Sequence, residues 1–330
     1  MKTWLITLLA LSAAGLQSQA LSDPSTARPN DFGVSSFPIG TYGSCAQGAH
    51  NPSGNTFLNT SGFRDGAVLI LAESGTTVTS SYIDQDRVTQ SLSLSTTTGT
   101  TATLARKGQV IPGFTSLCVL GPGNEKGYSA SMTVDAGSLT YNAGMVFLTL
   151  TGDLLSDAGA CGTLSQPAAS FWVLCKDRQG DALPSIDVGP SPATQLPAGQ
   201  YSCVTQVETF ASINGLNHHV TGGDSGTLTL TADGSKVTGQ YSGDDSLAGA
   251  LRFGATTPTT AIAEAGQSLM APCMVPMGTS RPSQTPEPLP IAAAALTLTD
   301  STLFLSFGGT TAAGSSCPGA HVAGSLICRR

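Results

Sequence analysis

The chain has 330 residues, of which 40% are hydrophobic and only 11% are charged, and its net charge at pH 7 is −7. Charged residues usually make up about 25% of a globular domain, so Ser, Thr and Gly must cover much of the surface. The acidic balance and the lack of any basic cluster in the sequence exclude nucleic acid as a partner and argue against binding to an anionic membrane.

Residues 1–20 are predicted to be a secretory signal peptide. Lys2 provides the positive start, Leu5–Leu11 the apolar run and Ser18–Ala20 a small-x-small cleavage site. The apolar run is too short to span a bilayer. We therefore expect cleavage near Ala20, no membrane span in the mature chain, and a secreted or extracytoplasmic location in the periplasm or at the cell surface. Residues 21–36 are interpreted as a flexible leader.

Two stretches downstream carry the same strand, turn and strand pattern, at Asp65–Tyr82 and at Asp224–Tyr241. In each, apolar and polar residues alternate as in a half-buried strand, and a glycine then permits a tight turn. A Pro-x-Gly-x-Tyr motif precedes both, within Phe37–Cys45 and within Leu196–Cys203. The chain therefore contains a tandem duplication.

The cysteines repeat in the same way. They stand at positions 45, 118, 161 and 175 in the first copy and at 203, 273, 317 and 328 in the second. An even number of cysteines in an exported chain indicates disulfides. The predicted organisation is β-domain 1 at 37–175, a linker rich in Pro and Gly at 176–195, and β-domain 2 at 196–330.

Domain 2 contains eight strand candidates at short, regular spacing and no stretch with helical periodicity. They are Gln200–Val207, Gly226–Ala232, Lys236–Ser242, Ser246–Phe253, Gln267–Val275, Ala293–Thr299, Thr302–Phe307 and Val322–Arg329. We predict an all-β chain of two tandem, disulfide-bonded antiparallel domains, each a small eight-stranded up-and-down (calycin-like) barrel without exposed edges. A pair of β-sandwiches is the alternative.

An up-and-down barrel also suggests how the cysteines pair. Closure places the start of the first strand beside the end of the last, whereas the two inner cysteines lie at the opposite rim. The nested pairing predicted for domain 2 is Cys203–Cys328 with Cys273–Cys317. By homology, that of domain 1 is Cys45–Cys175 with Cys118–Cys161.

Catalytic motifs receive little support. Gly223–Gly226 resembles the Gly-Asp-Ser-Gly-Gly-Pro segment of chymotrypsin-like serine proteases, but the match ends after four residues, and the first copy has Gly66 where Ser225 stands. We interpret Ser225 as a turn residue at the entrance to a strand, and His218 and His219 as surface loop residues. We expect no catalytic residue, no metal site and no cofactor.

Four residues shared by the copies are candidates for binding. Tyr82 matches Tyr241, and Asp86 matches Asp245. Tyrosines inside a small barrel either pack the core or line a ligand pocket. The aspartates either form solvated turns or contribute to a calcium site, although no full set of oxygen ligands is present.

Small closed barrels in lipocalins and avidins enclose one small ligand, and this chain resembles those proteins in predicted architecture. Tyr42 and Tyr201 stand where a lipocalin carries the Trp of its Gly-x-Trp opening. Fold-level likeness does not establish a function.

The function predicted from the sequence is that of a secreted, non-enzymatic binding protein whose partner is a surface glycan, another protein or a small apolar ligand. The lack of a catalytic constellation common to both copies motivates this prediction. The alternatives are a structural component of a cell envelope or matrix, and a secreted enzyme that uses one domain only, with His218 or His219 as its base.

Overall fold

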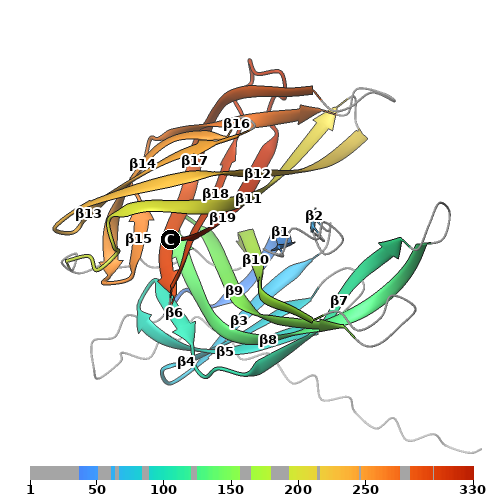
Figure 1. The fold of residues 1–330 in the computed structure, drawn as a ribbon, viewed down its shortest axis with the longest axis vertical. Coiled ribbons are helices and arrows are strands. Elements are labelled where there is room, and N and C mark those ends of the chain that lie inside the picture. Colours follow the sequence, from blue (N-terminus) through green and yellow to red (C-terminus); the bar gives the residue numbers. More distant parts are fainter. Residues whose placement is uncertain are drawn as a thin grey trace, which may run out of the picture. The chain divides into compact units, whose positions relative to one another are not determined.

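A computed structural model describes eleven segments of the chain (Figure 1), namely residues 37–50, 61–63, 67–83, 89–119, 125–156, 165–179, 193–213, 216–244, 247–275, 283–299 and 301–330. The predicted signal peptide, the leader and most of the linker lie outside these segments, so the proposed domain boundaries stay predictions. Val34–Arg330 form one compact unit.

The first barrel is built from antiparallel strands that pair mostly with their neighbours along the chain. The strands are β1 (Gly40–His50), β2 (Ser61–Phe63), β3 (Val68–Ser74), β4 (Thr77–Ile83), β5 (Thr89–Thr98), β6 (Thr101–Leu104), β7 (Gln109–Val119), β8 (Glu125–Asn142), β9 (Met145–Ser156) and β10 (Ser165–Gln179). Pairing of β10 with β1 closes the ring of eight, to which β2 and β7 are additional.

The second barrel repeats this plan. Its strands are β11 (Gly199–Ile213), β12 (Leu216–Asp233), β13 (Lys236–Gly243), β14 (Ala248–Thr257), β15 (Thr260–Ala263), β16 (Ser268–Val275), β17 (Ser283–Thr299), β18 (Thr302–Thr310) and β19 (His321–Arg329). Pairing of β19 with β11 closes it. The prediction of two eight-stranded antiparallel barrels is therefore confirmed, and the sandwich alternative does not apply because the first strand of each copy pairs with the last.

All eight strand candidates of the second copy correspond to observed strands, and the short strand β15 is an addition. The predicted hairpin turn is also present, since Asp233 pairs with Lys236 across Gly234 and Ser235. Gly234 has φ 58° and Gly75, at the same place in the first copy, has φ 62°. Glycine occupies both positions because it adopts this left-handed conformation without a steric penalty.

Two local interpretations are wrong. Ser225 does not lie in a turn at a strand entrance, because β12 runs without a break through Gly223–Gly226 and Ser225 pairs with Val204 of β11. His218 and His219 belong to the same strand rather than to a surface loop. The strand candidate Gly226–Ala232 is thus the second half of a much longer strand.

A glutamine side chain bridges a break in each barrel wall. Gln267 precedes β16, and its amide accepts a hydrogen bond from the Arg252 backbone N–H (2.6 Å) and donates to the Arg252 carbonyl (2.9 Å). Gln109 does the same with the backbone of Ser93, at 2.8 and 2.9 Å. The amide thereby replaces the strand pairing that is lost where β15 ends and β16 begins, and where β6 ends and β7 begins.

The Pro-x-Gly-x-Tyr motif packs the start of the first strand of each barrel. The Tyr42 hydroxyl donates to the Pro38 carbonyl at 2.7 Å, and Tyr201 donates to the Pro197 carbonyl at 2.6 Å. Burial raises the pKa of Tyr42 far above its usual range, so this hydroxyl keeps its proton. Both tyrosines lie inside their barrels.

An arginine at the end of the last strand, or directly after it, contacts the same motif in each barrel. Arg178 Nε donates to the Ile39 carbonyl at 3.0 Å, and Arg330 Nη2 donates to the Ala198 carbonyl at 2.6 Å. The Arg330 guanidinium also lies 5.0 Å from the centre of the Tyr201 ring, within range of a cation–π contact. Each barrel is thus closed by the same tyrosine and arginine contacts.

Two of the predicted disulfides are present. Cys45 pairs with Cys175 and Cys203 with Cys328, each joining the first and last strands of one barrel. Cys317 is also disulfide-bonded. The remaining predicted pairs depend on side chains outside the described set, those of Cys118, Cys161 and Cys273.

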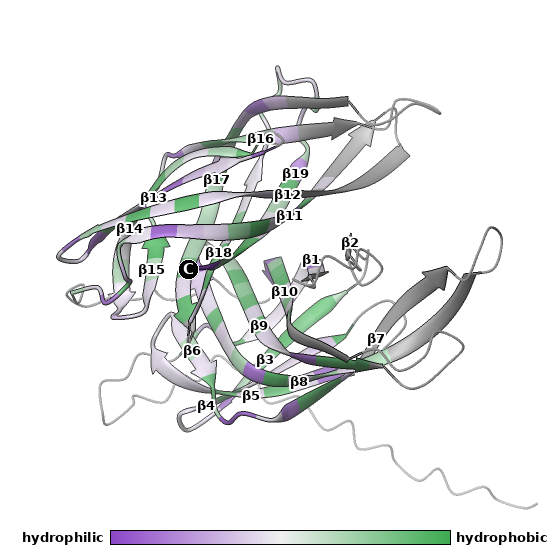
Figure 2. Cartoon of the chain, viewed as in Figure 1, coloured by the Kyte–Doolittle hydropathy of each residue, from purple (hydrophilic) through white to green (hydrophobic). Residues whose placement is uncertain are grey.

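Apolar side chains fill the interior of both barrels, and Figure 2 shows hydrophobic and polar residues alternating along many of the strands. The first interior includes Leu69, Val78, Leu94, Leu139, Leu150, Phe171 and Val173. The second includes Leu228, Leu230, Val237, Phe253, Leu296, Leu305 and Phe307. The described interiors are therefore packed cores.

Candidate functional site, a cleft between the two barrels

Strands β18 and β19 are buried on both faces, since almost every residue in them is shielded from solvent. Strand β13, in contrast, buries alternate residues only. The inner faces of β18 and β19 line the core of the second barrel. Their outer faces must be covered by something else, because a barrel wall packed on one side alone shows the alternating pattern.

A third apolar cluster supplies that cover and contains residues from both barrels. Its members are Ala46, Met145, Phe147, Trp172 and Leu174 from the first barrel and Ala293, Ala295 and Ala323 from the second. The Asn142 amide also donates to the Ala294 carbonyl at 2.8 Å. We call this cluster the inter-barrel core.

Equivalent strands of the two copies contribute to this contact. Trp172 and Leu174 of β10 and Ala323 of its equivalent β19 belong to the inter-barrel core, together with Phe147 of β9. Alanines from β17 and β19 face the large side chains of β9 and β10. The barrels therefore pack through related surfaces, with large residues mostly on one and small residues mostly on the other.

Gly48 allows the closest approach within this contact. A Cβ atom at this position would lie 2.4 Å from Trp172 Nε1 of the first barrel and 2.6 Å from Gln206 Oε1 of the second. Real side-chain carbons do not tolerate such distances, so only glycine fits. Trp172 and Gln206 are 2% and 7% exposed, which places polar atoms from both barrels in one buried position.

A small cleft opens beside the inter-barrel core. Its floor is apolar and its mouth carries polar and charged groups. It is lined by Ser44, Ala46, Met145, Leu174, Lys176, Gly308, Gly309, Thr310, His321, Val322 and Ala323. The lining comes from β1, β9 and β10 of the first barrel and from β18 and β19 of the second, so neither copy alone could form it.

His321 stands at the mouth and contacts the first barrel. Lys176 Nζ lies 3.2 Å from His321 Nε2, and Thr310 Oγ1 lies 3.0 Å from His321 Nδ1. A lysine ammonium can only donate, so the ring nitrogen that accepts from Lys176 must be unprotonated. Burial and the Lys176 charge lower the pKa of His321, while Asp177 opposes this shift. The imidazole is therefore neutral at neutral pH.

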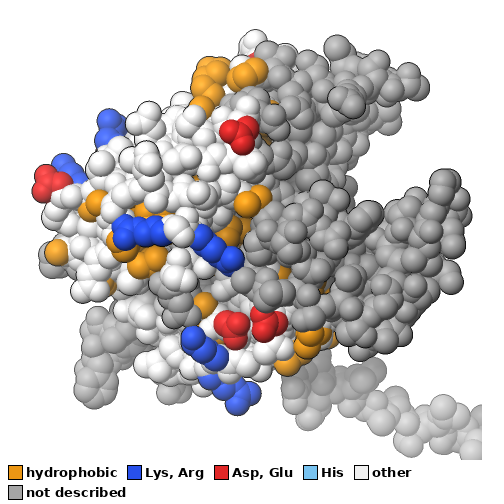
Figure 3. Space-filling view, in the orientation of Figure 1, with side chains coloured by type: hydrophobic (Ala, Val, Ile, Leu, Met, Phe, Trp, Pro, Cys, Tyr) orange, Lys and Arg blue, Asp and Glu red, His pale blue; other side chains and the backbone are white. Residues whose placement is uncertain are grey.

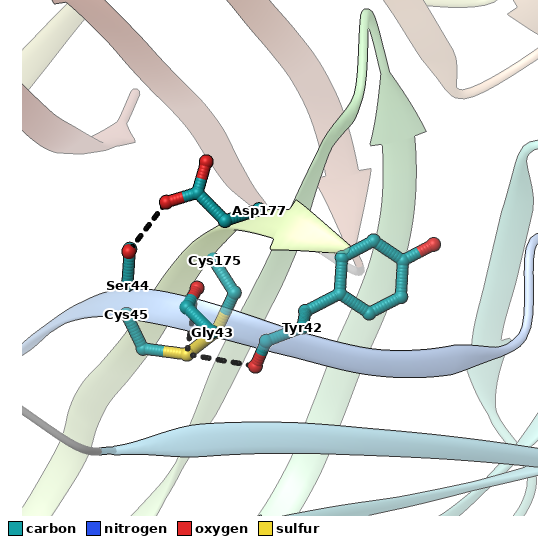
Figure 4. The surroundings of a disulfide bond; sticks show 6 residues. All are labelled: Tyr42, Gly43, Ser44, Cys45, Cys175 and Asp177. Carbon is teal, nitrogen blue, oxygen red and sulfur yellow. Dashed lines mark hydrogen bonds between the residues drawn. A yellow bond between two sulfur atoms is a disulfide. The ribbon is translucent and has the colours of Figure 1, made fainter. Parts of the chain in front are cut away.

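A bulge beside the disulfide of the first barrel positions Lys176. Ser44 and Asp177 have φ angles of 46° and 57°, and the Ser44 hydroxyl donates to Asp177 Oδ2 at 2.5 Å. Figure 4 shows the two side chains pointing toward each other next to Cys45 and Cys175. The register of β1 and β10 shifts here, whereas β11 and β19 pair without a shift in the second barrel.

The structure does not bring the two sequence-predicted binding tyrosines to this cleft. Tyr82 and Tyr241 are buried in the interiors of different barrels, at 2% and 3% exposure. The Tyr241 hydroxyl lies 2.8 Å from Thr205 Oγ1, and the Tyr82 ring packs edge-on against Phe171. Both tyrosines support the cores, and a binding role for either one stays a prediction.

Asp86 and Asp245 lie outside the described residues, so their binding role also stays a prediction. Within the described segments, no group of three His, Cys, Asp or Glu residues is placed to hold a metal ion, and no helix is long and apolar enough to cross a membrane. On the described part of the face in Figure 3, charged side chains are few and scattered, and small hydrophobic patches lie among them.

Sequence reasoning missed Lys176 and His321 as a pair. The two residues are 145 positions apart, and no motif links them. His321 lies seven residues before the last cysteine, and the first copy has Ala168 at that place. Comparing the two copies therefore could not point to this pair, because His321 has no equivalent in the first copy.

No protein-family model and no curated protein sequence matches the chain. Among solved structures it is similar to a mutant of the vaccine antigen transferrin binding protein B from Haemophilus parasuis Hp5, with a TM-score of 0.29 and 11% identity over 88% of this chain and 76% of that one. It is also similar to a DUF3598 family protein of unknown function from Nostoc punctiforme PCC 73102, with a TM-score of 0.24 and 11% identity over 89% and 96% of the two chains. At these scores the likeness carries no argument about activity.

Proposed function

We propose that the chain is an exported, non-enzymatic binding protein that holds its partner on the outside of the barrels, at the cleft between them. One observation carries this proposal. The described barrel interiors are occupied by their own side chains, whereas the cleft presents an apolar floor with polar groups at its mouth. Binding sites commonly combine these two features and lie where two domains meet.

The disulfides support an exported protein. Bonds such as Cys45–Cys175 and Cys203–Cys328 form and persist in oxidising compartments and are rare in the cytosol. Together with the sequence-predicted signal peptide, they favour an extracytoplasmic location. Mass spectrometry of the mature protein from its source would test this, with an N-terminus near Leu21 and oxidised cysteines as the expected result.

Native mass spectrometry of protein purified from its source, before and after a change at the cleft, tests the binding role. Thr310 is exposed and lines the cleft, so Thr310→Trp should block the mouth without disturbing a core. The matched control is Thr227→Trp, at an exposed position on β12.

A bound mass that is present in the wild type and the control but absent from Thr310→Trp is the expected result. A bound mass that survives in Thr310→Trp would place the site elsewhere, for example at Tyr82 or Tyr241. Retention of the protein in washed envelopes without any soluble pool would favour the structural alternative.

A further inference from the structure

We propose that the cleft binds a small carboxylate with a short alkyl chain, the carboxylate on Lys176 and the chain on the apolar floor. This inference rests on the proposed function and specifies the ligand class for the same site.

The Lys176 ammonium at the mouth of the cleft would bind the carboxylate. Lys176 Nζ contacts both ring nitrogens of His321, at 3.2 and 3.4 Å, and no carboxylate of the described residues lies within ion-pair distance of it. Asp177 is the nearest candidate in sequence, but its carboxylate accepts from Ser44. A lysine whose described partner is a neutral imidazole retains donors for an incoming anion.

The apolar floor of the cleft would bind the alkyl chain. Ala46, Leu174 and Ala323 belong to the inter-barrel core and also line the cleft. The Gly308 backbone widens the opening, since a Cβ there would lie 2.9 Å from Leu174 Cδ2 and 3.0 Å from Met145 Sδ. An alkyl group laid on this floor removes apolar surface from water on both sides, which favours binding.

The size of the cleft limits the ligand. Its volume is about 50 Å³, well below the roughly 150 Å³ of an engineered apolar cavity that admits benzene. A flat ring of benzene size is too large for this space, whereas a flexible chain of a few carbons can lie along the apolar floor and extend through the open mouth. Butanoate and hexanoate are therefore the appropriate probes.

Titration calorimetry of the full-length mature protein with these probes tests the proposal. Hexanoate is expected to bind at least tenfold more tightly than hexan-1-ol, because only the carboxylate gains the charge-assisted hydrogen bond with Lys176. Lys176→Met should remove this difference while leaving hexan-1-ol binding unchanged. Lys236→Met, at an exposed lysine of β13, is the matched control and should bind as the wild type does.

A second readout uses His321. A bound carboxylate near the ring favours its charged form, so hexanoate should raise the pKa of His321 measured by NMR, and hexan-1-ol should not. Equal affinity for acid and alcohol, or full hexanoate binding by Lys176→Met, would overturn the proposal. Absence of binding by any probe would also overturn it, but a source-derived mass displaced by Thr310→Trp would leave the proposed function standing.

Discussion

Ser44 and Asp177 form a matched pair of extra residues, one on each side of the seam of the first barrel. Tyr42 and Cys45 are separated by two residues, whereas the equivalent Tyr201 and Cys203 are separated by one. On the opposite strand, Cys175 is followed by Arg178 after two residues, and Cys328 by Arg330 after one. The added residues take left-handed conformations and hydrogen-bond each other, so the register on either side is preserved.

The fold should therefore tolerate the loss of Ser44 only when Asp177 is deleted with it. Deleting Ser44 alone shifts β1 by one residue and turns Tyr42 out of the core, with an expected loss of about 3 kcal/mol, the scale of removing a large core side chain. Deleting Ser44 and Asp177 together should restore the pairing seen in the second barrel. Thermal unfolding of the two variants checks this, and equal loss in both would show that the residues are not coupled.

Gln267 is predicted to stabilise the second barrel through its amide rather than through its size. Gln267→Leu leaves the Arg252 backbone groups without their partner, which should lower the free energy of unfolding by about 2 kcal/mol. Denaturant unfolding measures this change. Gln240→Leu, at an exposed position of β13, is the control, and a similar loss there would contradict the bridging role.

Stability should decrease as the pH falls below about 6.5 because of His321. Its pKa is lowered in the folded chain, so the unfolded chain takes up the proton first, near the ordinary value of about 6.5, and unfolding is favoured as the pH decreases. At pH values above about 6.5, His321 makes its full contribution to the free energy of unfolding. The melting temperature between pH 7.5 and 5.5 should therefore drop more in the wild type than in His321→Gln, and parallel curves would contradict the assignment.

The disulfide of the second barrel should contribute strongly to stability. It links residues 125 positions apart, and closing a loop of this length stabilises a fold by about 5 kcal/mol. Cys203→Ala with Cys328→Ala should lower the free energy of unfolding by this amount in denaturant titrations. The equivalent change at Cys45 and Cys175 provides the comparison, because that loop spans a similar 130 positions.

Cutting the chain between the barrels should not separate them. A protease site introduced at 184–190 lies in the predicted linker, and the inter-barrel core does not depend on it. After cleavage of the folded protein, both halves should elute together in size-exclusion chromatography. Ala295→Asp buries a charge in the inter-barrel core, so its cleaved halves should separate. Separation of the wild-type halves would contradict the importance of this contact.

The sequence predicted the barrels well because their determinants are local and occur twice. The Asp224–Tyr241 hairpin needs only alternating side chains and the left-handed Gly234, and its copy confirmed the register. The Cys203–Cys328 pair followed from up-and-down closure. The extent of β12 was underestimated, since Gly223 and Ser225 resemble turn residues but pair along β11, where tertiary pairing overrides local preference.

The cleft could not be predicted in the same way. Lys176 and His321 meet only because two barrel surfaces pack, and neither residue stands in a motif. A tryptophan in a strand such as β10 is expected in the core of its own barrel, but Trp172 lies in the inter-barrel core. A pattern of period 2 shows that a residue faces outward but not that another surface covers it. The paired Gly-Gln at 108–109 and 266–267 was visible in the sequence and would have identified the wall bridges.

Because both barrels belong to one chain, the inter-barrel core stays assembled when the protein is diluted. Two separate barrels that met through this surface would dissociate as their concentration fell, as any pair of independent molecules does. Joined in one chain, they meet at an effective concentration of the order of millimolar, whatever the volume into which the protein is released. Covalent connection thus keeps a composite cleft assembled in a protein whose sequence predicts that it leaves the cell.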